Sequence, residues 1–149
     1  MRVLIDADAC PVTDIAIALA KRRGLEVILF CDTSHFMQRE GARTVMVAKG
    51  ADAADFKLIG ELQKGDAVVT QDYGLAAMAL ARGAFVMAPS GMEYTGENMS
   101  SLLESRHMVK KLLRAGGRVK GPAKRTSEQD EAFRQAFARL LDDGRRAAD

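Results

Sequence analysis

Two aspartates one residue apart follow the first apolar run of the chain. Asp6 and Asp8 come after the apolar residues 3–5, and Pro11 lies three positions further on. In an α/β sheet, ligands bind outside the carboxyl ends of the parallel strands. A first strand that ends in Asp-x-Asp therefore directs two carboxylates to that edge. The same aspartates could cap a helix, because aspartate is a preferred N-cap residue.

Two further acidic groups stand where an element is expected to begin or end. Asp52 and Asp55 lie three residues apart at the start of a predicted helix, so they are neighbours on its surface. Asp72 follows the apolar run 67–69 and precedes another predicted helix. A helix-capping role is the alternative interpretation for Asp52 and for Asp72.

Clustered carboxylates raise one another's pKa unless a cation neutralises them. Hard oxygen ligands suit Mg²⁺ or Mn²⁺, and such ions position phosphates and activate water. We therefore expect a Mg²⁺ or Mn²⁺ site with catalytic roles for Asp6, Asp8, Asp55 and Asp72. The expected metal ligands are Asp6, Asp8, Asp52, Asp55 and Asp72, and the expected supporting residues are Asp32, Ser34 and Thr70.

Apolar runs and amphipathic segments predict the elements that position these aspartates. Strands are expected at residues 2–5, 25–30, 43–48, 67–70 and 84–88. Helices are expected at residues 12–23, 52–63, 73–82, 98–115 and 127–142. Because parallel strands need crossover helices, this order predicts an α/β domain with a mainly parallel central sheet of about five strands and C-terminal helices. Asn98 and Thr126 are the expected N-caps of the last two helices.

The segment 106–125 contains many basic residues and no acidic one. Its first part makes a cationic helix face, and residues 116–125 continue it as a Gly-rich basic linker. A phosphate backbone is a natural partner for such a stripe. The alternatives are a solvated helix face and a run that docks on acidic surface of the same chain. The residues expected to contact nucleic acid, with RNA preferred, are Arg106, Lys110, Lys111, Arg114, Arg118 and Lys120.

The composition favours a soluble cytoplasmic protein. The chain has 149 residues, 48% hydrophobic and 28% charged, with a net charge of +2. No apolar run approaches the ~20 residues of a membrane span, and no secretory signal is evident. Cys10 and Cys31 make no disulfide framework, and His35 and His107 are not spaced as zinc ligands. The sequence leaves open whether the chain forms a homodimer.

Four segments resemble the YaiI/YqxD family of uncharacterised bacterial proteins, which has a PIN-like fold. They are IDADACPV at 5–12, GADAADFK at 50–57, VVTQDYGLA at 68–76, and the tail from GGR at 116–118 to GP at 121–122. The resemblance implies one three-layer PIN-like domain over residues 1–149.

PIN-like nucleases hold a divalent metal with acids at the first strand end, at a helix start and in a Thr-x-Asp after a later strand. Asp6, Asp55 (or Asp52) and Asp72 match these places. Such nucleases usually have a further mid-chain glutamate, for which this sequence offers only Glu40.

Three functions are compatible with these patterns. The first is a metal-dependent phosphodiesterase, a nuclease acting on RNA. The second is a non-catalytic RNA- or ribosome-associated binding module that kept the fold without a complete metal site. The third is an aspartyl-phosphate phosphatase of the haloacid dehalogenase type, in which Asp6 would be the nucleophile. Cys10 disfavours the phosphatase, since it stands where that class has a threonine or valine.

Overall fold

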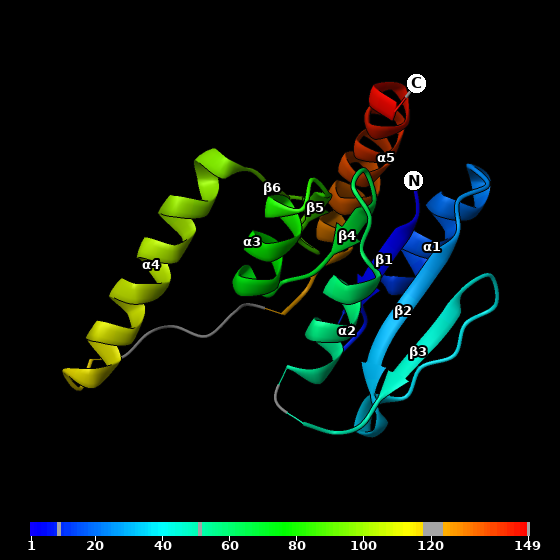
Figure 1. Cartoon of the computed structure of the whole chain (residues 1–149). Coiled ribbons are helices and arrows are strands. Elements are labelled where there is room, and N and C mark those ends of the chain that lie inside the picture. Colours follow the sequence, from blue (N-terminus) through cyan, green and yellow to red (C-terminus); the bar gives the residue numbers. More distant parts are fainter. Residues whose placement is uncertain (9, 51, 118–123, 149) are drawn as a thin grey trace.

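Six strands form one sheet in the computed structural model of the chain, which describes residues 1–8, 10–50, 52–117 and 124–148 (Figure 1). The strands are β1 (Val3–Asp6), β2 (Val27–Asp32), β3 (Arg43–Val47), β4 (Ala67–Val69), β5 (Phe85–Met87) and β6 (Glu93–Tyr94). The helices are α1 (Thr13–Arg22), α2 (Ala53–Glu61), α3 (Tyr73–Ala81), α4 (Gly96–Arg114) and α5 (Ser127–Ala148), with a short 3₁₀ helix η1 (Thr33–His35) after β2.

The strand order β3-β2-β1-β4-β5-β6 places β1 between β2 and β4. The pairs among β1 to β5 are parallel, and β6 is antiparallel to β5. Asp6 is paired with Phe30, and Ile5 with Val69, so three strands finish side by side. The residues that end β1, β2 and β4 are therefore brought to one edge of the sheet.

Helices cover both faces of the sheet and make a three-layer structure. On one face Val3 and Ile5 pack in a core with α1 and with Phe133 and Phe137 of α5. On the other face Leu4 packs in a second core with α2, α3 and the first part of α4. Both faces of β1 are buried, which explains why its sequence is continuously apolar rather than alternating. This architecture confirms the predicted α/β fold class and is consistent with a three-layer PIN-like fold.

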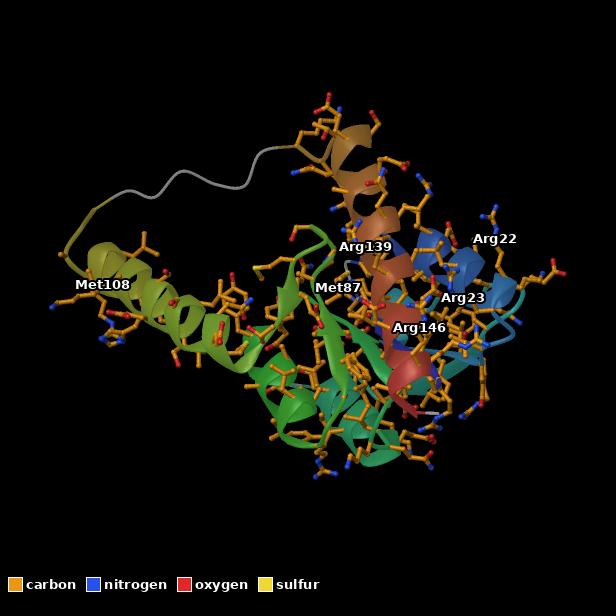
Figure 2. The ribbon with its side chains drawn as sticks, turned by 90° about the horizontal axis from the view of Figure 1, so that it is seen from above. Arg22, Arg23, Met87, Met108, Arg139 and Arg146 are labelled. Atoms are coloured by element: carbon orange, nitrogen blue, oxygen red, sulfur yellow. The ribbon has the colours of Figure 1, made fainter. Side chains whose placement is uncertain are left out.

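Helix α4 extends away from the rest of the domain (Figures 1 and 2). Its beginning is anchored, because Met99 is buried in the α2–α3 core. Further along, Leu103 and Met108 are 44% and 59% exposed, and Met108 lies far from the sheet in Figure 2. Among the described helices, none is long and apolar enough to span a membrane.

The C-terminal half differs from expectation in three places. Strand β6, which the sequence did not predict, makes six strands where about five were expected. Thr95, not Asn98, is the N-cap of α4, because the Thr95 hydroxyl accepts a hydrogen bond from Asn98 N and Asn98 Oδ1 accepts one from Thr95 N. Helix α5 continues beyond residue 142 because Gly144 is buried closely against Met1 and Phe85.

The predicted start of α5 was correct. Thr126 Oγ1 accepts a hydrogen bond of 3.3 Å from Gln129 N, and Gln129 Oε1 accepts one of 2.8 Å from Thr126 N. This reciprocal pair is the capping box expected from the Thr-x-x-Gln spacing.

Candidate metal centre

A cavity of about 260 Å³ lies at the carboxyl edge of the sheet. Asp6, Asp8, Asp32, Asp52 and Asp55 contribute to its lining. A sixth aspartate, Asp72, has a carboxylate oxygen within 4.8 Å of oxygens of Asp52 and Asp55. We call these six aspartates the acidic pocket. It contains every aspartate that the sequence predicted as a metal ligand and the supporting residue Asp32.

Thr70 connects the two strand ends that supply Asp6 and Asp72. Its hydroxyl donates a hydrogen bond of 2.9 Å to Asp6 Oδ2. The same oxygen, Thr70 Oγ1, accepts a hydrogen bond of 3.0 Å from the backbone N–H of Asp72. Because Thr70 is buried, this connection is shielded from solvent, and the predicted supporting role of Thr70 has a geometric basis.

Asp72 and Asp52 differ in the helix-capping role that the sequence left open for both. Asp72 Oδ1 accepts a hydrogen bond of 3.1 Å from Leu75 N, so Asp72 caps α3 while it contributes to the pocket. Asp52 stands at the N-cap position of α2, but its side chain makes no capping hydrogen bond. Its φ of 60° is the one positive φ at a non-glycine residue in the described part of the chain. Aspartate tolerates this conformation better than most residues.

The end of β2 and the loop after β1 form a second group within the pocket. Asp32 Oδ1 accepts hydrogen bonds from Ser34 N at 2.8 Å and His35 N at 3.0 Å. His35 Nδ1 lies 3.1 Å from Asp32 Oδ1 and 3.6 Å from Asp8 Oδ1. Asp8 Oδ1 is buried and has no hydrogen-bond partner among the described residues.

These contacts bear on three interpretations. Asp8 is not a helix cap, because the N-cap of α1 is Val12 and no side chain caps that helix. Ser34, an expected supporting residue, donates its backbone N–H to Asp32. His35, which the sequence did not assign to the site, lies against two carboxylates of the pocket. The spacing Asp32-x-x-His35 directly after a strand is the signal that could have predicted this proximity.

Two carboxyl groups of the pocket hold protons unusually well. Burial raises the pKa of Asp6 to about 6, with the charges of Asp8 and Asp72 adding to it and the Thr70 hydrogen bond opposing it. Burial also raises the pKa of Asp55 to about 7, and the charges of Asp6, Asp72 and Asp52 act in the same direction. Carboxylates with raised pKa values gain stability when a cation takes the place of the proton.

The pKa values of the Asp8 and Asp32 carboxyls are shifted in opposite directions. Burial and the charge of Asp32 raise the pKa of Asp8. Desolvation also acts to raise the pKa of Asp32, but the hydrogen bonds from His35 and Ser34 outweigh it and lower the pKa. A cation between these groups would neutralise both carboxylates.

The donor set fits a hard divalent cation. It consists of carboxylate oxygens, with one imidazole at the edge, and it includes Asp8 Oδ1, which is buried and accepts no hydrogen bond from the described residues. Oxygen-rich sites of this kind suit Mg²⁺ and Mn²⁺. Glu40, the candidate for a further acidic ligand, is exposed in the turn before β3, and none of the described pocket residues is a glutamate.

The predicted basic stripe is described only in part. Lys110, Lys111 and Arg114 are exposed on α4. Arg106 lies in the same helix, and its side chain is not described. The predicted contacts Arg118 and Lys120 lie outside the described residues.

One arginine of the basic segment 106–125 binds to other residues of the same chain. Arg125 forms an ion pair with Asp130, and its guanidinium donates a hydrogen bond of 2.7 Å to Pro89 O. The docked arrangement that the sequence left open therefore applies to Arg125.

Comparison with known proteins places the chain in a family. The family model described as "Uncharacterized BCR, YaiI/YqxD family" matches residues 4–143. A UPF0178 protein of Exiguobacterium sibiricum is 50% identical over 141 residues, which cover 95% of this chain and 96% of that protein. A UPF0178 protein of Clostridium acetobutylicum is 46% identical, with 95% and 97% covered, and one of Bacillus anthracis is 42% identical, with 95% and 99% covered. No solved structure matches the chain. The chain belongs to the YaiI/YqxD family of uncharacterised bacterial proteins.

Proposed function

We propose that the protein is a metal-dependent phosphodiesterase, a nuclease whose substrate is RNA. The observation that carries the proposal is the convergence of six aspartates, from the ends of β1, β2 and β4 and the start of α2, on one pocket. Such a collection of negative charge is unfavourable without a cation. Carboxylate-bound divalent ions in turn most often serve phosphate chemistry.

Asp6, Asp8, Asp52, Asp55 and Asp72 would hold Mg²⁺ or Mn²⁺, with Asp32 and Thr70 in support. A bound ion of this kind positions a phosphate and lowers the pKa of a water molecule. The Thr70 hydroxyl keeps the Asp6 carboxylate in one orientation. Asp55, whose pKa is raised to about 7 by burial and by its acidic neighbours, would hold the ion in place of its proton.

Helix α4 supports a nucleic acid as the substrate. Lys110, Lys111 and Arg114 are exposed near its C-terminal end. In Figure 1 that end of α4 points to the same end of the molecule as the carboxyl ends of β2 and β3. Exposed Lys and Arg contacts supply most of the sequence-independent affinity for a phosphate backbone.

The test is cleavage of labelled single-stranded RNA in Mn²⁺ by the wild type and by Asp6→Asn. We expect Asp6→Asn to lower the rate by at least about 10–100-fold, the loss that even an outer-shell partner of a metal ligand causes. Asp143→Asn is the matched control, because Asp143 is 74% exposed on α5 and outside the pocket. Equal rates for the wild type and Asp6→Asn would show that the proposal is wrong.

A second candidate is a non-catalytic RNA- or ribosome-associated binding module. The observation in its favour is that none of the described pocket residues is a glutamate, whereas the related nucleases usually have one. RNA binding that persists in EDTA, together with no turnover in Mg²⁺ or Mn²⁺, would favour this candidate over the nuclease.

A further inference from the structure

Two phenylalanines stand apart from the other four in their exposure to solvent. Phe30, Phe133 and Phe137 are fully buried, and Phe85 is partly buried. Phe36 and Phe56, by contrast, are 57% and 68% exposed. Single exposed apolar side chains are common and need no explanation by themselves. The position of these two in the fold is what carries the inference.

Both exposed rings belong to residues next to the acidic pocket. Phe36 directly follows His35, whose Nδ1 lies 3.1 Å from Asp32 Oδ1. Phe56 directly follows Asp55, which lines the pocket. Consecutive Cα atoms are about 3.8 Å apart, so Phe56 starts one residue from a pocket aspartate, and Phe36 starts one residue from a histidine that lies against Asp8 and Asp32. The two rings come from different elements, since Phe36 follows η1 and Phe56 lies in the first turns of α2.

Two lysines also lie next to pocket residues or to these rings in the sequence. Lys49 precedes Gly50, which lines the pocket, and Lys57 follows Phe56. Both lysines are exposed. Neither takes part in any of the ion pairs found among the described residues. We call Phe36, Lys49, Phe56 and Lys57 the rim.

We infer that the rim binds single-stranded nucleic acid, with the two rings stacking on unpaired bases and the lysines contacting phosphates. The inference rests on the proposed nuclease function and names its substrate class. Proteins that bind single strands without sequence preference combine aromatic stacking platforms with cations along the backbone. The bases of a duplex are already stacked on one another, so they are not available to the rings.

Charge disfavours a second copy of the chain as the partner of the rim. Two identical rims in contact would bring two sets of the exposed lysines Lys49 and Lys57 together, and like charges facing each other cost several kcal/mol. In a nucleic acid, by contrast, the negatively charged phosphates would contact the lysines and the cation held by the pocket, and the bases would stack on the rings.

The test measures binding by fluorescence anisotropy in Ca²⁺, with an unstructured RNA oligonucleotide and with the duplex of the same sequence. Phe36→Leu and Phe56→Leu keep apolar bulk and remove the ring, whereas Phe36→Tyr and Phe56→Tyr keep a ring that can stack. We expect each Leu variant to bind the single strand about 5- to 150-fold more weakly, the loss of one stacked base. The Tyr variants should bind like the wild type.

Met78→Ala on α3, where the side chain is 39% exposed, is the control for loss of exposed apolar surface away from the pocket.

Four results would overturn the inference, and they separate it from the proposed function. Leu variants that bind like the wild type, equal wild-type affinity for duplex and single strand, or Leu variants that dissociate an oligomer in sedimentation would each overturn the inference alone. A wild type that neither binds nor cleaves RNA would overturn the proposed function as well.

Discussion

The Thr70 hydroxyl donates a hydrogen bond of 2.9 Å to Asp6 Oδ2 and thereby ties the end of β4 to the end of β1. The same hydroxyl oxygen accepts the backbone N–H of Asp72 at 3.0 Å. One buried side chain therefore orients two carboxyl-bearing residues on neighbouring strands. Outer partners of this kind are part of a metal site, because they hold the ligands in position.

Replacing Thr70 by valine should weaken cation binding without removing a carboxylate. Valine preserves the shape of threonine but leaves Asp6 Oδ2 without its donor and Asp72 N without its acceptor. We expect Mn²⁺ affinity to fall by about 10–100-fold. Titration calorimetry measures the affinity, and Thr70→Ser, which keeps the hydroxyl, should retain most of it. Unchanged affinity in Thr70→Val would mean that Thr70 has no positioning role.

The metal-free protein should lose stability as the pH rises from about 4 to about 7. The pKa of Asp55 is raised by burial to about 7, and that of Asp6 to about 6, both from 3.8. The folded state therefore binds protons more tightly than the unfolded state, and this stabilisation disappears as the pH passes through the folded pKa values. After allowance for solvent screening at Asp55, we expect an effect of about 1 kcal/mol from this residue.

Thermal unfolding between pH 4 and pH 8 in EDTA measures this dependence. Asp55→Asn removes the titrating group, so its unfolding temperature should change less over that range. Saturating Mn²⁺ should raise the unfolding temperature most at pH 8, where the carboxylates are ionised and protons no longer compete with the cation. A wild type that becomes steadily more stable up to pH 8 without metal would contradict the prediction.

The acidic edge of the sheet could be predicted because buried strands have a simple sequence pattern. β1 is apolar up to its last residue, Asp6, and β4 is apolar throughout and is followed by Thr70; parallel strands bring such ends together. Asp6 and Asp72 were therefore assigned to one edge from the sequence alone. Asp55 was assigned from helical spacing, since it lies three residues after Asp52 in the first turn of the predicted helix.

Other features depend on contacts that periodicity does not encode. β6 has two residues, too few to show an alternating pattern, and Tyr94 is buried by its neighbours, with its ring 6.0 Å from that of Tyr73. His35 is brought to Asp8 by a 3₁₀ turn that Asp32 caps. Turn geometry of this kind is set by local hydrogen bonds and not by hydrophobic spacing.

Asp66 should be important for stability but not for cation binding. It is 3% exposed at the amino edge of the sheet, opposite the pocket. Its carboxylate accepts hydrogen bonds from Arg2 N at 2.9 Å, Arg2 Nη2 at 2.8 Å and Gln63 N at 2.9 Å. Asp66→Ala leaves the backbone N–H groups of Arg2 and Gln63 without this acceptor, while the Arg2 guanidinium keeps its contacts with Glu61. The loss should be about 1–3 kcal/mol for each unpaired donor.

Urea unfolding measures the loss in Asp66→Ala, and Mn²⁺ titration of the folded protein should give the wild-type affinity. Asp6→Ala should behave in the opposite way, with loss of Mn²⁺ binding and stability in EDTA that is preserved or increased, because it removes a buried charge. If both variants lost affinity equally, the two aspartates would not have the separate roles described above.

The basic end of α4 should determine how strongly RNA binding depends on salt. Lys110, Lys111 and Arg114 are exposed on this helix. For single strands each phosphate contact contributes about 0.7 to the slope of log affinity against log salt, so changing all three residues to glutamine should lower the slope by about 2. Arg146→Gln on α5, 83% exposed, is the control and should leave the slope unchanged (Figure 2). An unchanged slope in the triple variant would mean that this face of α4 is only solvated.

Helix α5 should unfold together with the acidic pocket, because it covers one face of the strand that carries Asp6. Phe137 is fully buried, and its ring stacks on that of Phe133 at a centroid distance of 5.1 Å. Phe137→Ala should cost about 3–5 kcal/mol, whereas Phe137→Leu, which keeps more of the volume, should cost less. Urea unfolding followed by circular dichroism and by loss of Mn²⁺ binding should give one coincident transition in both variants. If Phe137→Ala lost part of its helical signal before Mn²⁺ binding while the wild type did not, α5 would unfold separately from the core that contains β1.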